Sequence, residues 1–185
     1  MGPLLLVPSI AFATPPAAPR TVERVVATVD GKPIWLSDIR GAALAFRQQL
    51  AGLPLDKQLK AGRDVFEQLV TREIERVLVR KEARRLQVSV EDMEVDRALA
   101  AVAKQNDLDV PALLKEAKKQ GLSEASYRAE IRFQILEGKL LRMHWSRTGL
   151  VVDESREGML RAQDSRTQWM KELRKQSRVT IRVQP

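Results

Sequence analysis

The sequence predicts a mainly helical single domain that carries a small antiparallel sheet. The β-branched run 25–29 is followed by Asp30-Gly31 and a short return strand, which is a strong hairpin signal because glycine adopts positive φ without strain. The other good alternating strand, 179–183, stands at the far end of the chain. Two strands alone are marginal in water, so we expect this last strand to pair with the hairpin and close the domain.

The return strand 32–35 and the segment after it predict an edge strand followed by a helix. Pro33 has no N–H to donate to a neighbouring strand, so we expect this strand to lie at an edge or to pair on one side only. Ser37 is the expected N-cap of the helix, with Asp38 favourable in its first turn. The Gly-Leu-Pro stretch at 52–54 ends this first helix.

A long helix is expected from about residue 56 to 86, because apolar residues recur there at helical spacing. The opposite face carries arginines interleaved with glutamates, so we expect much of this charge to be paired internally. Gly62 weakens the early part of the helix and is a candidate position for a break. The buried stripe comprises Phe66, Leu69, Val70, Ile74, Val77 and Leu78, and the basic face Arg72, Arg76, Arg80 and Arg84.

The third helix is expected to open with a capping box. Ser89 is the predicted N-cap, and Asp92 stands where glutamate or glutamine is usual. Apolar residues at helical spacing carry this helix to about Asn106.

Three more helices follow before the closing strand. A short one starts at 109–111, where proline suits a first turn, and Gly121 is its expected C′ residue. Ser123 should cap a long helix that ends at 148–149. A very polar helix at 154–177 then leads into the last strand.

The N-terminal segment resembles an export signal. Residues 1–13 form an apolar run that ends in Ala-Phe-Ala, similar to an h-region with a small-x-small cleavage site, although no basic residue precedes Arg20. The run is shorter than the roughly 20 residues needed to span a bilayer. We therefore assign 1–20 to a signal-like or disordered segment, cut near Ala13, and 21–185 to the folded domain.

Composition removes most enzymatic chemistry. The 185 residues include no cysteine and one histidine, His144, so no Cys-based or His-rich metal site and no thiol nucleophile can form. Glycine-rich phosphate loops and the G-x-S-x-G pattern are absent from the sequence. We expect no enzyme, no cofactor and no metal. The net charge of +8 suits acidic or polyanionic partners but does not identify one.

Three separated segments resemble the SurA-type periplasmic chaperones and their relatives. The opening VERVVATVDGKPIWLSD resembles the family's first hairpin and helix, and the segment 99–141 its helix, short helix and long basic helix. Residues 169–183 are similar to its closing helix and strand. The matching positions are Glu23, Val25, Val26, Ala27, Val29, Asp30, Ile34, Ser37, Asp38, Ala103, Gln105, Asn106, Gly121, Leu122, Tyr127, Arg128, Ile131 and Arg132.

The chain departs from that family in one respect. Its members usually carry one or two parvulin-type prolyl isomerase domains between the long helix and the closing helix, where this chain has only about 149–154. The parvulin pair of histidines cannot exist in a chain with one histidine. The resemblance therefore implies the chaperone module alone, without isomerase activity. It also implies binding of unfolded polypeptides, chiefly outer-membrane proteins in the periplasm.

A holdase-type chaperone needs an apolar groove open to extended peptide and enough charge to stay soluble. Methionine and aromatic side chains suit such a groove because they adapt to varied partners, although each could equally belong to the core. The predicted client-binding residues are Phe46, Leu53, Met93, Phe133, Met143, Trp145 and Met159.

Two other functions fit the sequence. A basic helical module could bind nucleic acid or an anionic surface, as the net charge and the arginines of 72–85 suggest. The interleaved glutamates and the export signal oppose it, so we expect no nucleic acid partner. A structural subunit of an envelope complex is the third reading, and sequence alone leaves it open, as it does self-association.

Overall fold

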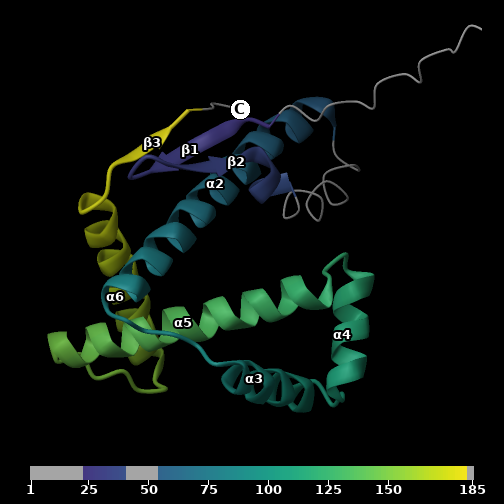
Figure 1. Cartoon of the computed structure of the whole chain (residues 1–185), viewed down its shortest axis with the longest axis vertical. Helices are drawn as coiled ribbons and strands as arrows, with labels where there is room; N and C mark the ends of the chain where they lie inside the picture. Colours follow the sequence, from purple (N-terminus) through teal and green to yellow (C-terminus); the bar gives the residue numbers. More distant parts are fainter. Residues whose placement is uncertain (1–22, 41–53, 183–185) are drawn as a thin grey trace, which may run out of the picture.

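The computed structural model describes residues 23–40 and 54–182. Figure 1 shows a small sheet at one end and the helices α3, α4 and α5 at the other, connected by the long helix α2 and by α6. The predicted mainly helical fold with a small antiparallel sheet is confirmed. The elements are β1 (Val25–Val29), β2 (Lys32–Trp35), α2 (Leu55–Arg85), α3 (Asp92–Gln105), α4 (Val110–Lys119), α5 (Glu124–Thr148), α6 (Arg156–Lys175) and β3 (Val179–Ile181).

The closing strand pairs with the opening hairpin, as predicted. The sheet order is β2-β1-β3 and both pairings are antiparallel, with Val29 opposite Val179. The N–H of Arg182 donates to the carbonyl oxygen of Val26 at 2.9 Å, just past the end of β3. The predicted strand 179–183 extends by one residue beyond the described part of the chain.

The hairpin turn has the conformation that its sequence predicts. Asp30 and Gly31 both have positive φ, 50° and 79°, which two-residue turns between twisted strands require. β2 is an edge strand of this sheet, which suits Pro33 because proline donates no hydrogen bond.

Two helix starts differ from the prediction. Residues 36–40 are helical, and the N–H of Trp35 donates to Asp38 Oδ2 at 2.8 Å, so Asp38 rather than Ser37 satisfies the first turn. Ser37 instead donates its hydroxyl to Glu23 Oε2 at 3.2 Å. In both cases the N-cap is a residue other than the predicted serine, and a carboxylate three residues after that N-cap accepts the N-cap N–H.

The N-cap of α3 is Glu91, two residues after the predicted Ser89. The N–H of Glu91 donates to Glu94 Oε2 at 3.0 Å, so Glu94 occupies the position that we assigned to Asp92. Ser123 does cap α5, accepting the N–H of Ser126 at 3.1 Å.

The long helix α2 is continuous through Gly62, so the candidate break does not occur. A glycine costs about 1 kcal/mol relative to alanine in a helix interior, which a helix of this length with a buried stripe tolerates. The boundaries of α2 and of α4 to α6 agree with the prediction to within two residues, and Gly149 ends α5 with φ 69°. The segment in which the first helix was predicted to end lies outside the described residues.

The buried residues form two clusters. The larger, here called the sheet core, joins β1 and β2 to α2, α6 and the second half of α5, and Ile74 at its centre is fully buried. The smaller, here called the three-helix lobe, joins α3, α4 and the first half of α5 around Leu99. Because α5 contributes to both clusters, it is the element that places one relative to the other.

Candidate functional site

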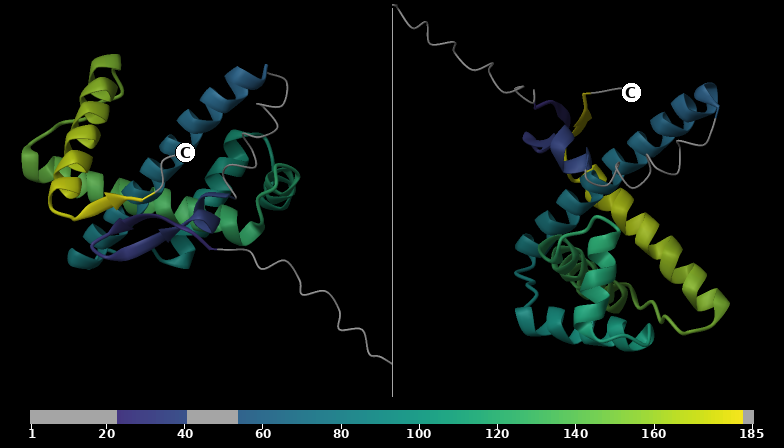
Figure 2. Two further views of the ribbon diagram at one scale, coloured as in Figure 1. Left: turned by 90° about the horizontal axis from the view of Figure 1, so that it is seen from above. Right: turned by 90° about the vertical axis from the view of Figure 1, so that its right-hand side faces the viewer.

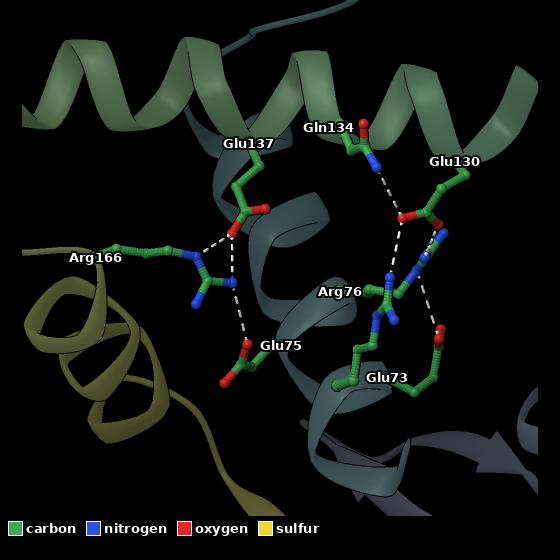
Figure 3. Close-up of polar contacts among 8 residues, drawn as sticks. Glu73, Glu75, Arg76, Glu130, Gln134, Glu137 and Arg166 are labelled. Atoms are coloured by element: carbon green, nitrogen blue, oxygen red, sulfur yellow. Dashed lines mark hydrogen bonds and ion pairs between the residues drawn. The ribbon is translucent and has the colours of Figure 1, made fainter. Parts of the chain in front are cut away.

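Charged side chains hold α5 and α6 against α2, as Figure 3 shows. Arg166 of α6 donates from Nε to Glu137 Oε1 of α5 at 2.9 Å and from Nη2 to Glu75 Oε2 of α2 at 3.3 Å. One guanidinium therefore joins three helices. This contact orients α6, whose first half projects from the rest of the molecule.

A second charged contact joins α2 to the other half of α5. Arg76 Nη1 donates to Glu130 Oε2 at 2.5 Å, and Arg72 Nη2 donates to Glu130 Oε1 at 3.1 Å. Burial raises the pKa of Glu130, but the hydrogen bond and the charge of Arg76, with the charge of Arg72, outweigh it and lower the pKa overall. Neighbouring Glu73 behaves oppositely, because burial raises its pKa more than Arg76 and Arg80 lower it.

Phe133 and Trp145, two of the predicted client-binding residues, are half-buried and pack against the sheet core. The Arg76 guanidinium lies 4.5 Å from the centroid of the Phe133 ring, and Arg80 lies 5.8 Å from it. Within the described part of the chain, the Trp145 indole N–H is buried without a hydrogen-bond partner. Both side chains thus contribute to the packing of α5 on α2 and α6.

The three predicted methionines are exposed on three different helices. Met93 of α3 is 64% exposed, Met143 of α5 40% and Met159 of α6 58%. Phe46 and Leu53 lie outside the described residues. Whether these side chains contact a client stays a prediction.

The structure shows exposed apolar side chains of which sequence reasoning had named only Met159. Large apolar side chains are exposed at the start of α2 and around the turn from α5 to α6, and Figure 2 shows the first halves of α2 and α6 projecting on the same side of the molecule. Helical spacing did not predict this exposure, because the spacing does not show which apolar residues lack a neighbouring helix or strand to pack against. This exposed apolar set comprises Leu55, Leu59, Val151, Val152, Met159 and Leu160.

The turn that carries Val151 and Val152 has a defined structure. Ser155 caps α6 by accepting the N–H of Gly158 at 3.0 Å, and Asp153 Oδ1 accepts the N–H of Ser155 at 3.0 Å. A Cβ atom on Gly158 would lie 2.5 Å from the carbonyl oxygen of Asp153, so only glycine fits there. The sequence therefore fixes the turn closely against α6 while leaving Val151 76% exposed.

None of the helices in the described residues is both long and apolar enough to cross a lipid bilayer. Exposed apolar side chains that lie next to one another, such as Val151 with Val152 and Met159 with Leu160, are more typical of contact surfaces than single scattered ones. Here they stand on a molecule whose remaining surface is strongly charged.

The order of the elements, a hairpin closed by the last strand around a helical body, defines the class of fold. The chain belongs to the SurA N-terminal domain family, whose sequence model matches residues 22–141. The match ends within α5, so α6 and β3 lie beyond it.

Curated relatives are similar to between about two thirds and nine tenths of the chain. "Chaperone SurA" of Photobacterium profundum is 30% identical over 118 residues, which are 63% of this chain and 26% of the relative. "Chaperone SurA" of Alkalilimnicola ehrlichii is 25% identical over 169 residues, 90% of this chain and 38% of the relative. The chain thus spans roughly a quarter to two fifths of the length of these curated relatives.

A similar solved structure comes from work on two SurA-like chaperones of Campylobacter jejuni. It is 20% identical with a TM-score of 0.37, and the similarity covers 64% of this chain and 42% of that chain.

Proposed function

We propose that this protein is a periplasmic holdase-type chaperone that binds unfolded polypeptides, chiefly outer-membrane proteins. The observation that carries the proposal is the exposed apolar set, which lies at the start of α2, in the turn before α6 and at the start of α6. Membership of the SurA N-terminal domain family supports it, as do relatives named as chaperones.

The physical basis is weak binding at several separate places. Apolar contact gains roughly 25 cal/mol per Å² buried, so one exposed leucine or methionine holds a client only loosely. Several such contacts along one unfolded chain act together, because each bound segment raises the effective concentration of the next. Charged side chains between the contacts keep the chaperone soluble while it holds an apolar client.

The aggregation of a urea-denatured outer-membrane protein after dilution tests this proposal. A near-stoichiometric amount of the protein should suppress light scattering. The variant Met159→Lys should suppress it several-fold less well, because a charge replaces an exposed apolar contact. Gln163→Lys is the matched control, since it adds the same charge to an exposed position of α6. Equal activity of the two variants would refute the proposed site. Absence of suppression by the unaltered protein would refute the proposed function.

The salt dependence of client binding separates this function from the nucleic-acid or anionic-surface alternative. Many arginines of the basic face already have carboxylate partners, including Arg72, Arg76 and Arg80. We therefore expect client binding to change little between low and physiological salt. A fall of several orders of magnitude would favour a polyanionic ligand instead.

We propose further that the protein has no prolyl isomerase activity. Only residues 149–155 separate α5 from α6, and the single histidine, His144, lies beside Trp169 with ring centroids 6.1 Å apart. A proline-limited refolding assay should give the uncatalysed rate. Acceleration that His144→Ala abolishes would contradict this proposal.

Periplasmic localisation rests on the N-terminal segment, which lies outside the described residues. Mass analysis of the periplasmic fraction should find a mature N-terminus near Thr14. Finding only intact protein in the cytoplasm would overturn both the localisation and much of the chaperone proposal.

A further inference from the structure

A small depression lies where the two clusters of the molecule meet. It has a volume of about 220 Å³ and lies between the end of α2, the segment 86–91 and α5. Its apolar lining includes Ala83 of α2, Val88 of the connecting segment and Leu136 of α5. Sites for small molecules typically measure about 300–1,000 Å³, so this depression has the size for one bulky side chain rather than a cofactor.

Three arginines surround this apolar lining. Arg80 and Arg84 come from α2, and Arg132 comes from α5. Arg132 is paired with Asp92, and Arg80 lies 3.7 Å from Glu73.

Arg84 differs from the other two arginines. It is exposed, and among the described residues no ion pair or side-chain hydrogen bond engages it. In the connecting segment, the Glu91 carboxylate accepts a hydrogen bond from the Ser89 hydroxyl at 3.5 Å. One guanidinium beside the apolar lining is therefore available for an incoming anion.

We propose that this depression binds a client segment in which a bulky apolar side chain stands next to an aspartate or glutamate. The apolar side chain enters against Val88 and Leu136, and the carboxylate pairs with Arg84. Guanidinium suits this role because it presents several donors in one plane to a carboxylate.

An internal acidic residue fits better than a free chain end, because the depression is shallow and open at the surface. A polypeptide can therefore pass across it and continue on both sides. The inference rests on the proposed function and deepens it, because it gives the chaperone a sequence preference that the exposed apolar set alone does not provide.

The test measures fluorescence anisotropy with the full chain and labelled peptides that are acetylated and amidated at their ends. One peptide carries a central Phe-Glu pair in a Gly/Ser context, and two matched peptides carry Phe-Gln and Ser-Glu. Arg84→Gln removes the proposed partner. Arg63→Gln is the control, because Arg63 is an exposed residue of the same helix and its replacement removes the same charge.

We expect Arg84→Gln to weaken binding of the Phe-Glu peptide about fivefold, which corresponds to about 1 kcal/mol. Arg63→Gln should leave it within twofold. The Phe-Gln peptide should bind the unaltered protein about fivefold more weakly and should be insensitive to Arg84→Gln, as coupling between the two groups requires. The Ser-Glu peptide should bind poorly to every variant.

Three results would overturn the inference. Equal losses with Arg84→Gln and Arg63→Gln would mean that only net charge matters. Binding of the Phe-Gln peptide as tight as that of the Phe-Glu peptide would show that the carboxylate is not recognised. Tighter binding of a peptide that ends in a free Phe carboxylate would identify a chain terminus as the ligand. Aggregation suppression is measured separately, so failure of the chaperone function is distinguishable from failure of this site.

Discussion

The sheet core and the three-helix lobe are stabilised by different kinds of contact. The sheet core unites distant parts of the chain, because Val26 of β1 and Trp169 of α6 belong to the same buried cluster. The lobe lies within residues 92–148, and its buried cluster is far smaller. Ion pairs of α5 with α3, such as Lys139 Nζ to Glu94 Oε2 at 2.7 Å, supplement that cluster.

This difference indicates where the molecule opens first. Exposed and half-exposed ion pairs contribute little stability each, whereas buried apolar area contributes most of it. The three-helix lobe therefore has the kinds of contact expected of a region that unfolds locally while the rest of the molecule stays folded. An opening lobe would leave α6 and the sheet in place, because they pack on α2.

The largest expected losses of stability come from Ile74→Ala and Leu99→Ala, and the comparison of the two variants separates the two clusters. Both residues are almost fully buried, one in each cluster. Each change should cost about 2–5 kcal/mol, because it leaves a cavity. Ile74→Ala should lower the global melting temperature. Leu99→Ala should mainly release amide protons of α3 and α4, as hydrogen exchange with mass spectrometry would detect. Equal loss of protection throughout the chain in both variants would show a single cooperative unit.

Removal of β3 by truncation after Gln176 should have the next largest effect. It exposes one edge of β1 and removes the half-buried Val179. It also removes Ser177, whose hydroxyl accepts a hydrogen bond from Lys81 Nζ at 2.9 Å. We expect a loss of about 2 kcal/mol in urea unfolding, since a few net hydrogen bonds and one partly buried side chain are lost. An unchanged unfolding midpoint would mean that the closing strand does not stabilise the sheet core.

Acidification should loosen the attachment of α5 to α2 before it unfolds the sheet core. The pKa of Glu130 is lowered from its ordinary value of 4.5, so its contribution is present above that pH and is lost as pH falls through the lowered value. The raised pKa of Glu73 acts in the opposite direction, because protonation relieves its burial.

Glu130→Gln should therefore cost about 1 kcal/mol at pH 7, and this cost should shrink as pH falls through the lowered pKa of Glu130. Unfolding monitored by Trp fluorescence at pH 7 and in a series of increasingly acidic buffers measures the change. Glu67→Gln is the control, since Glu67 is an exposed glutamate of α2, the helix with which Glu130 pairs. A pH-independent cost for Glu130→Gln would show that its effect is not electrostatic.

The smallest expected losses of stability come from replacing two of the serines predicted as N-caps, and they should differ between the two. Ser123→Ala should cost about 0.5–1 kcal/mol, because Ser123 accepts an N–H at the start of α5. Ser89→Ala should change stability by less than about 0.5 kcal/mol, because Glu91 and Glu94 cap α3 instead. Thermal unfolding of both variants measures the comparison. A larger effect of Ser89→Ala would restore the original assignment of the cap.

The sequence alone was sufficient for the features that depend on local chemistry. Asp30-Gly31 specified the turn because both positions need positive φ, and Ser123 and Gly149 marked the two ends of α5 because their backbone roles are local. The pairing of the last strand with the first followed from the exclusion of other partners. The resemblance to the SurA family was also carried by sequence, since its matching segments keep their order.

Only the tertiary structure decided which apolar side chains are buried and which carboxylate partners each arginine has. Trp145 and Met159 both belong to long helices with apolar residues along them, yet one packs on the sheet core and the other is exposed, because neighbouring helices cover α5 and not the first half of α6. Arg76 and Arg84 lie on the same face of α2, but only Arg76 meets a glutamate of α5. Periodicity fixes the face of a helix, whereas burial depends on what packs against it.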